Sequence, residues 1–175
     1  MGALRDRLQW QPKQSAVHDD PHRYLLMRPD VLMGGAVGLP PALRTTWWQA
    51  WAAAACEHGG ASLRAYAAQG GGDAAALVES TVQAAADLGW GCWTVDRHAG
   101  GLLLQVQSSP FVAGWRAAGG GAEADGVCAP VRGLLQALAQ ALWPGREVQV
   151  HERACACQHV GDACHFEARV EGAAP

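Results

Sequence analysis

A chain of 175 residues is long enough to bury the core of one domain. Half of its residues are hydrophobic and 17% are charged, which excludes disorder over the whole length. The net charge is −3 and the sequence has no basic block, so nucleic acid is not expected as a main partner.

The sequence pattern gives no sign of a signal peptide or a membrane-spanning segment. No apolar run follows the charges of residues 1–10. The longest apolar candidate, residues 47–56, is shorter than the roughly 18 residues of a membrane helix and contains Gln49. We therefore expect a cytoplasmic protein with no membrane partner. In that compartment the six cysteines are expected to be metal ligands or core residues rather than disulfides.

The first half of the chain is predicted to be mainly helical. Residues 1–22 mix charged residues, proline and histidine, and are expected to form a flexible arm before a single domain over residues 23–172. A short strand is predicted over residues 24–27. Residues His58-Gly59-Gly60 are expected to end the helix predicted over residues 42–57. Asp73 is a plausible N-cap of the helix predicted over residues 74–88. Helices are predicted over residues 29–35, 42–57, 61–68 and 74–88.

The second half changes to a strand pattern. A hairpin turn is predicted at residues 99–101, and a short helix is expected after Ser108. Apolar residues at helical spacing predict an amphipathic helix over residues 128–143. Strands are predicted over residues 90–96, 102–107, 147–152 and 164–170. The sequence therefore predicts an α+β fold, with N-terminal helices packed on a mostly antiparallel sheet that ends in a C-terminal β-hairpin.

The residues that indicate chemistry gather at the turn of this last hairpin. Three cysteines, Cys155, Cys157 and Cys164, lie near Glu152 between the two predicted strands. A hairpin turn brings Cys155 or Cys157 close to Cys164, and Cys128 at the start of the preceding helix could complete a set of four. Zn²⁺ prefers four tetrahedral ligands drawn from thiolate, imidazole and carboxylate. The alternative is that these cysteines are buried core residues without a metal.

The order of these motifs over residues 75–170 resembles the 4-vinyl-reductase domain family. The matching segments are Gly89-Trp90-Gly91, Ser108-Ser109-Pro110-Phe111, Val127-Cys128, Gly145-Arg146-Glu147-Val148, Glu152-x-x-Cys155 and Gly161-Asp162-x-Cys164-x-Phe166. This family includes proteins linked to bacteriochlorophyll synthesis and the sensor domains of phenol-responsive transcription activators. The resemblance implies a ligand-binding domain of this fold that forms a homodimer.

The resemblance also implies a zinc site. In the sensor branch, one cysteine at the helix start, a Glu-x-x-Cys and a later cysteine hold the ion, which corresponds to Cys128, Glu152, Cys155 and Cys164. The gap between the last two cysteines is one residue longer than in the family, so Cys157 is an alternative to Cys155. His159 and His165 are reserve ligands. A site with four protein ligands has no open position for water, so we expect a structural zinc.

A ligand pocket is expected between the helices and the sheet, because apolar and aromatic walls are typical of such pockets. The candidate ligand-binding residues are Trp48, Trp51, Trp90, Trp93, Gln105, Phe111 and Trp115. By the resemblance, Gln105 stands where the phenol sensors have a ligand-binding tryptophan, and residues 84–86 are alanines where they have a histidine. The expected ligand is therefore apolar and larger than phenol, or lacks a hydroxyl group.

The sequence contains no nucleophile elbow, P-loop or dinucleotide-binding motif. The main hypothesis is consequently a domain that binds or senses a hydrophobic small molecule, and no catalytic residue is assigned. One alternative is an enzyme or accessory protein of tetrapyrrole metabolism. A second is a structural adaptor subunit.

Overall fold

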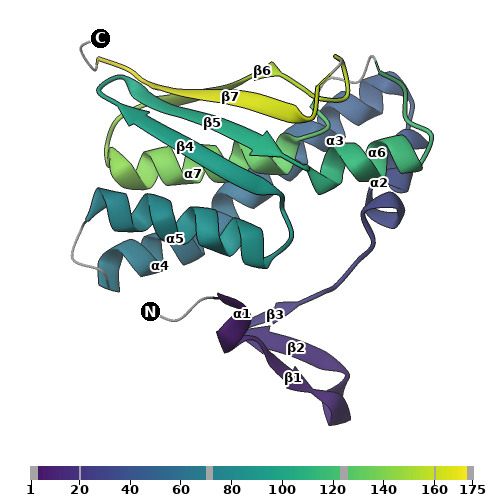
Figure 1. Ribbon diagram of the computed structural model, residues 1–175, viewed down its shortest axis with the longest axis horizontal. Helices are drawn as coiled ribbons and strands as arrows, with labels where there is room; N and C mark the ends of the chain where they lie inside the picture. Colours follow the sequence, from purple (N-terminus) through teal and green to yellow (C-terminus); the bar gives the residue numbers. More distant parts are fainter. Residues whose placement is uncertain (1–3, 20, 70–72, 123–125, 160, 173–175) are drawn as a thin grey trace.

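A computed structural model describes residues 4–19, 21–69, 73–122, 126–159 and 161–172 (Figure 1). It consists of a main body of helices on a four-stranded sheet, and a small N-terminal module that projects from this body. Among the described residues, no helix is both long enough and apolar enough to cross a membrane.

The N-terminal module is a three-stranded antiparallel sheet in the order β1-β2-β3, preceded by a short helix. Its turn between β1 and β2 is closed by Ser15, whose left-handed backbone (φ 48°) lets its N–H bond to the carbonyl of Pro12. An ion pair between Arg7 and Asp19 (2.9 Å) ties the helix to β2. The elements are α1 (Leu4–Arg7), β1 (Gln9–Gln11), η1 (Pro12–Gln14), β2 (Ala16–Asp19) and β3 (His22–Tyr24).

This regular structure was not predicted for the segment that the sequence marks as a flexible arm. The strands are only three or four residues long, so they show little alternation of apolar and polar residues. The strand predicted over residues 24–27 is wrong, because β3 ends at Tyr24 and residues 25–28 form the connection to the main body.

The helical half has one long helical run where the sequence predicted a break. The helix α2 (Pro29–Val37) is followed by α3 (Pro41–Ala54), a π-helical turn η2 (Ala55–Gly59) and α4 (Gly60–Gln69). The predicted end at residues 58–60 is therefore wrong. A Cβ at Gly59 would lie 2.4 Å from the side chain of Leu134, so this glycine serves close packing against another helix rather than a helix stop. Asp73 is confirmed as the cap of α5 (Ala74–Asp87), because its carboxylate accepts a hydrogen bond from the Ala75 N–H (2.9 Å).

The sheet of the main body is antiparallel throughout, with the strand order β4-β5-β7-β6. Helices lie on one of its faces (Figure 1). The elements are β4 (Cys92–His98), β5 (Gly101–Gln107), α6 (Pro110–Ala117), α7 (Ala129–Leu142), β6 (Val148–Ala154) and β7 (Ala163–Val170). The predicted α+β architecture is confirmed.

Strand alternation determines which side chains enter the core. On β5, Leu102, Leu104 and Val106 are buried against the helices, whereas Leu103 on the other face is exposed. Cross-strand register places Cys164 beside Val106, so this cysteine also points to the helix-covered face. The core and the candidate metal ligands thus share one side of the sheet.

Candidate metal centre and aromatic cluster

Three elements, β6, β7 and α7, bring the predicted metal ligands together. Cys164 lies at the start of β7, and Glu152 lies opposite Phe166 near the end of β6. The pairing of β6 with β7 has a register irregularity between Glu152 and Ala154, and Cys155 follows immediately after the strand. Cys128 precedes the first residue of α7, which packs against β6 and β7.

The ligand atoms of Cys128, Glu152, Cys155 and Cys164 all lie within 4.8 Å of one another. The Sγ atoms of Cys128 and Cys164 are 3.6 Å apart, and those of Cys155 and Cys164 are 3.8 Å apart. A tetrahedral zinc with Zn–S bonds of about 2.3 Å would space its sulfurs about 3.8 Å apart. The same distances are far longer than the roughly 2.05 Å of a disulfide. The cluster therefore has the spacing of a metal centre and could hold an ion.

This group of Cys128, Glu152, Cys155 and Cys164, here called the cysteine cluster, is electrostatically suited to a cation. Hydrogen bonds with Cys155 and Cys164, together with burial, raise the pKa of Cys128 well above its ordinary value of 9.0. For Cys164 the hydrogen bond with Cys128 lowers the pKa, but the contact with Cys155 and burial raise it, and the net direction is upward. Three thiols beside a carboxylate cannot all ionise in such a place unless a positive charge joins them.

The reserve ligands are not among the four residues whose ligand atoms converge. Cys157 is buried, with its Sγ 3.1 Å from that of Cys155, but it is not one of the four residues whose ligand atoms converge. His159 is exposed in the turn after Cys157. His165 follows Cys164 on β7 and therefore points to the opposite face of the sheet, where it is exposed.

Two polar groups on α6 contact the cysteine cluster. Ser109 caps α6, and its Oγ also lies 3.4 Å from the Sγ of Cys128. At the other end of α6, the guanidinium of Arg116 donates a hydrogen bond to the carbonyl oxygen of Ala156. These roles of Ser109 and Arg116 were not predicted from the sequence. The Ser-Pro pair at residues 109–110 signals a helix start, but no local pattern indicates a contact with Cys128.

Five of the predicted aromatic residues form one connected cluster. The rings of Trp48 and Trp51 on α3 stack at 6.1 Å, and Trp48 meets Trp115 of α6 edge to face at 5.9 Å. Phe111 of α6 makes edge-to-face contacts with Trp51 (5.6 Å) and with Trp90 before β4 (5.2 Å). Trp48 and Trp115 are buried, whereas Trp51 and Trp90 are partly accessible. The accessible part of the cluster is thus Trp51 and Trp90, which both contact the buried ring of Phe111.

The other two predicted ligand residues lie apart from these ring contacts. Trp93 is buried on β4, and its indole N–H donates to the carbonyl of Trp90 (3.1 Å). Gln105 lies between the buried residues Leu104 and Val106 on β5. Its side chain therefore points to the opposite face of the sheet, beside His165, and away from the aromatic cluster.

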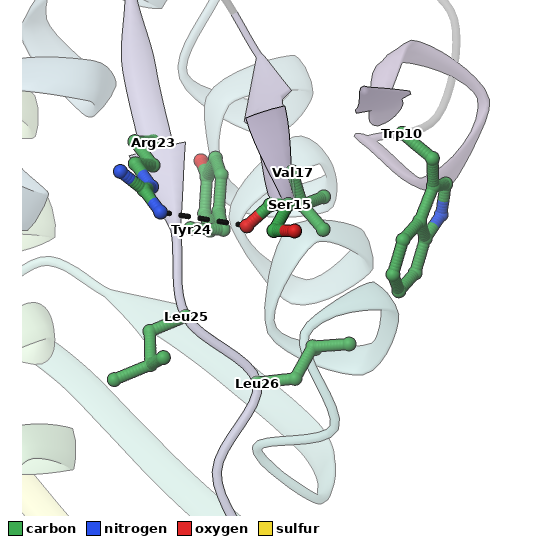
Figure 2. A pocket seen from close by; sticks show the side chains of 7 residues that line it. All are labelled: Trp10, Ser15, Val17, Arg23, Tyr24, Leu25 and Leu26. Atoms are coloured by element: carbon green, nitrogen blue, oxygen red, sulfur yellow. Dashed lines mark hydrogen bonds between the residues drawn. The ribbon is translucent and has the colours of Figure 1, made fainter. Parts of the chain in front are cut away.

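A cavity of about 370 Å³ lies in the N-terminal module and its connection to the main body. Figure 2 shows its lining, in which Arg23 donates a hydrogen bond to the carbonyl of Ser15 (3.4 Å). The side chains of Trp10, Leu25 and Leu26 border it and are between 67% and 77% exposed. No sequence pattern indicates this cavity, because strands β1 to β3 are too short to show a period.

No family model matches the chain, and no curated protein matches it. Among solved structures, the chain is similar to the phenol-responsive sensory domain of the transcription activator PoxR with phenol. The sequence identity is 17%, the TM-score is 0.76, and the match covers 95% of this chain and 86% of that chain. The resemblance that the motifs predicted is thus confirmed in the fold: this chain has the fold of the PoxR sensory domain, a 4-vinyl-reductase-like fold.

Proposed function

We propose that this protein is a small-molecule sensing domain whose ligand, hydrophobic or aromatic, contacts the rings around Trp51, Phe111 and Trp90. The observation that carries the proposal is the position of α6. This helix supplies Phe111 and Trp115 to the aromatic cluster, and both of its ends contact the cysteine cluster through Ser109 and Arg116. The likeness to a sensory domain that responds to phenol supports a ligand-binding role.

The chemistry of the aromatic cluster supports an apolar ligand with a flat ring. Edge-to-face contacts between aromatic rings contribute about 0.5–1.5 kcal/mol beyond the buried area, and a ligand ring can replace or extend them. Residues 84–86 are alanines, and Ala85 is buried on the face of α5 that enters the core. We infer a ligand larger than phenol from these small residues. Gln105 is left out of the proposed set, because its side chain lies on the other face of the sheet.

We propose that the cation of the cysteine cluster is a structural zinc held by Cys128, Glu152, Cys155 and Cys164. Three soft thiolates and one carboxylate match the preferences of Zn²⁺, and the sulfur spacing supports tetrahedral geometry. With the ion bound, the thiolates are neutralised and the β6–β7 turn is cross-linked to α7. The role of these residues is to fix the turn, and through Ser109 and Arg116 the position of α6.

Native mass spectrometry of freshly purified protein tests the binding role, because it reports retained metal and ligand together. A panel of phenol, larger aromatic compounds, hydrocarbons and porphyrins should then be titrated while tryptophan fluorescence is recorded. Larger aromatics should quench the wild type and bind at least tenfold more weakly to Trp51→Ala. The control Trp10→Ala removes an exposed indole in the N-terminal module and should bind normally. Selective binding of phenol alone would contradict the proposed ligand size, and binding of porphyrins alone would favour a role in tetrapyrrole metabolism.

We further propose a homodimer, a cytoplasmic location and a single sensing domain over residues 23–172. The N-terminal module and its connection to the main body offer exposed apolar side chains, among them Trp10, Leu25 and Leu26, which favours an assembly rather than an isolated chain. Light scattering across the micromolar range should give the mass of two chains. A monomer mass throughout that range would contradict the dimer, while the proposals on ligand and metal do not depend on this result.

A further inference from the structure

One buried thiol beside the cysteine cluster is not used by the proposed metal set. Cys128, Cys155, Cys157 and Cys164 are all buried, and Cys157 is the one outside the four converging ligands. Its Sγ lies 3.1 Å from the Sγ of Cys155. The corresponding distances from Cys164 to Cys128 and Cys155 are 3.6 and 3.8 Å. Of these three distances, the one between Cys155 and Cys157 is the shortest.

The local structure favours a bond within this pair over the other combinations. Cys155 and Cys157 belong to the same turn, in which the Gln158 N–H bonds to the carbonyl of Cys155 (2.9 Å). A disulfide needs a sulfur separation of about 2.05 Å, so this pair must close by about 1 Å. Cys128 and Cys164 are held by two different elements, α7 and β7, and must move a longer way between packed structures. Closure of the 155–157 pair needs only a change in side-chain torsions and in one turn.

Access also differs among the four thiols. Cys157 is 6% exposed, compared with 2% for Cys155 and none for Cys128 and Cys164. The neighbouring residues Gln158 and His159 are exposed, so the turn itself faces solvent. Cys157 is therefore the most accessible of the four cysteines to a small polar oxidant.

We propose that Cys155 and Cys157 form an oxidation site that a hydroperoxide converts into a disulfide. The Cys157 sulfur attacks the peroxide, the O–O bond breaks, and a sulfenic acid forms as the first water leaves. The Cys155 sulfur then attacks the sulfenic sulfur, the S–S bond forms, and the second water leaves. In total two thiols lose two electrons and two protons, and hydrogen peroxide is reduced to two molecules of water.

The consequence for the metal centre rests on the zinc site proposed above. A Cys155 sulfur in a disulfide is no longer a thiolate, so the set of Cys128, Glu152, Cys155 and Cys164 loses one of its four ligands. Oxidation at this turn would therefore release the ion and free the β6–β7 turn from α7. A reductant would restore the thiols and the site.

The test treats the full-length protein with hydrogen peroxide and follows two readouts. Peptide mass spectrometry should show a 155–157 disulfide, with a loss of two hydrogen masses that a reductant reverses. A zinc-sensitive dye should record release of the ion at the same rate. Cys157→Ser should slow both at least tenfold, whereas Cys92→Ser, which removes an exposed thiol on β4 outside the cluster, should leave both unchanged.

Three outcomes would overturn the proposal: a disulfide between other cysteines, oxidation that stops at sulfenic or sulfonic acid, or equal rates in Cys157→Ser and the wild type. Failure of the zinc proposal gives a different result. In that case the untreated protein contains no zinc, while the 155–157 disulfide still forms and is still absent in Cys157→Ser.

Discussion

The guanidinium of Arg116, near the C-terminal end of α6, donates a hydrogen bond to the carbonyl oxygen of Ala156 in the cysteine turn. Ala156 is itself buried, and its N–H lies 3.3 Å from the Sγ of Cys164. One residue between two of the cysteines is thus held on one side by the cluster and on the other by α6. This contact connects the proposed metal centre with the helix that carries Phe111 and Trp115.

Removal of the hydrogen bond between Arg116 and the Ala156 carbonyl should make both α6 and the turn at residues 155–159 less stable. Arg116→Met keeps an unbranched apolar side chain but leaves the Ala156 carbonyl without this donor, which should lower the free energy of unfolding by about 1–2 kcal/mol. Arg116→Lys, which retains a cationic donor, should recover part of the loss. Urea unfolding measures the stability, and hydrogen exchange at residues 155–159 should increase in the Met variant. Unchanged exchange in this turn would show that the contact does not hold it.

Loss of a metal ligand should weaken the protein far more than loss of a surface thiol. Cys164→Ser removes a central thiolate, and we expect at least about 3 kcal/mol of lost stability together with loss of bound zinc. Cys92→Ser should change stability by less than about 0.5 kcal/mol, because Cys92 is exposed. Thermal unfolding and metal analysis of the two variants provide the measurement. Equal stability of the two variants, or a metal content well below one ion per chain in the wild type, would refute the zinc site.

The stability of the metal-stripped protein should fall at alkaline pH. The pKa of Cys128 is raised by its hydrogen bonds with Cys155 and Cys164 and by burial, while in the unfolded chain it returns to about 9.0. Above that pH the unfolded state has released a proton that the folded state still holds, so stability decreases as pH rises from 9.0 towards the raised folded pKa. The groups facing Cys128 are Glu152, Cys155 and Cys164, and ionisation of any of them adds repulsion.

Chemical unfolding between pH 7 and pH 10 measures this effect. Protein loaded with zinc should show a much smaller decrease, because the bound ion stabilises the thiolates. A stripped protein whose stability rises over this interval would show that the sign is wrong and that the buried thiols are not held in their neutral form.

Two helical glycines provide a matched test of the packing between α3 and α7. A Cβ at Gly133 would lie 2.1 Å from the carbonyl oxygen of Ala52, so Gly133→Ala must push the two helices apart and should cost about 2–3 kcal/mol. A Cβ at Gly35 of α2 meets nothing within 4 Å, so Gly35→Ala should stabilise by about 0.5–1 kcal/mol. Thermal unfolding of both variants measures the two changes in stability. A similar effect of the two substitutions would mean that the helices do not approach as closely as described.

The parts of the fold that could be predicted are those with long periodic patterns. The four strands of the main sheet and the helix at residues 129–142 show clear alternation or helical spacing, and they were predicted nearly to their ends. The short strands β1 to β3 have too few residues to show a period. Gly59 and Gly60 predict a helix stop that the structure does not have, because a glycine needed for close helix packing has the same local sequence as a helix terminus.

The ligand residues of the candidate site could mostly be predicted from the sequence, but their contacts with other parts of the chain could not. Spacing and family resemblance indicate Cys128, Glu152 and Cys164, while the choice between Cys155 and Cys157 depends on the path of the turn after β6, which no sequence pattern reveals. The contacts of Ser109 and Arg116 join segments distant in the chain, so local propensities carry no information on them.

The position of β7 in the sheet determines when this fold can be completed during synthesis. β7 lies between β5 and β6, and pairs such as Leu104 with Phe166 join segments made early and late. Until β7 has left the ribosome, the hairpin of β4 and β5 keeps the edge of β5 open, because β7 is the strand that pairs with it there. Open edges with apolar faces promote association between nascent chains. Chains that stop before residue 163 should therefore aggregate rather than fold, and slow translation of the C-terminal segment should lengthen the interval in which chaperones are needed.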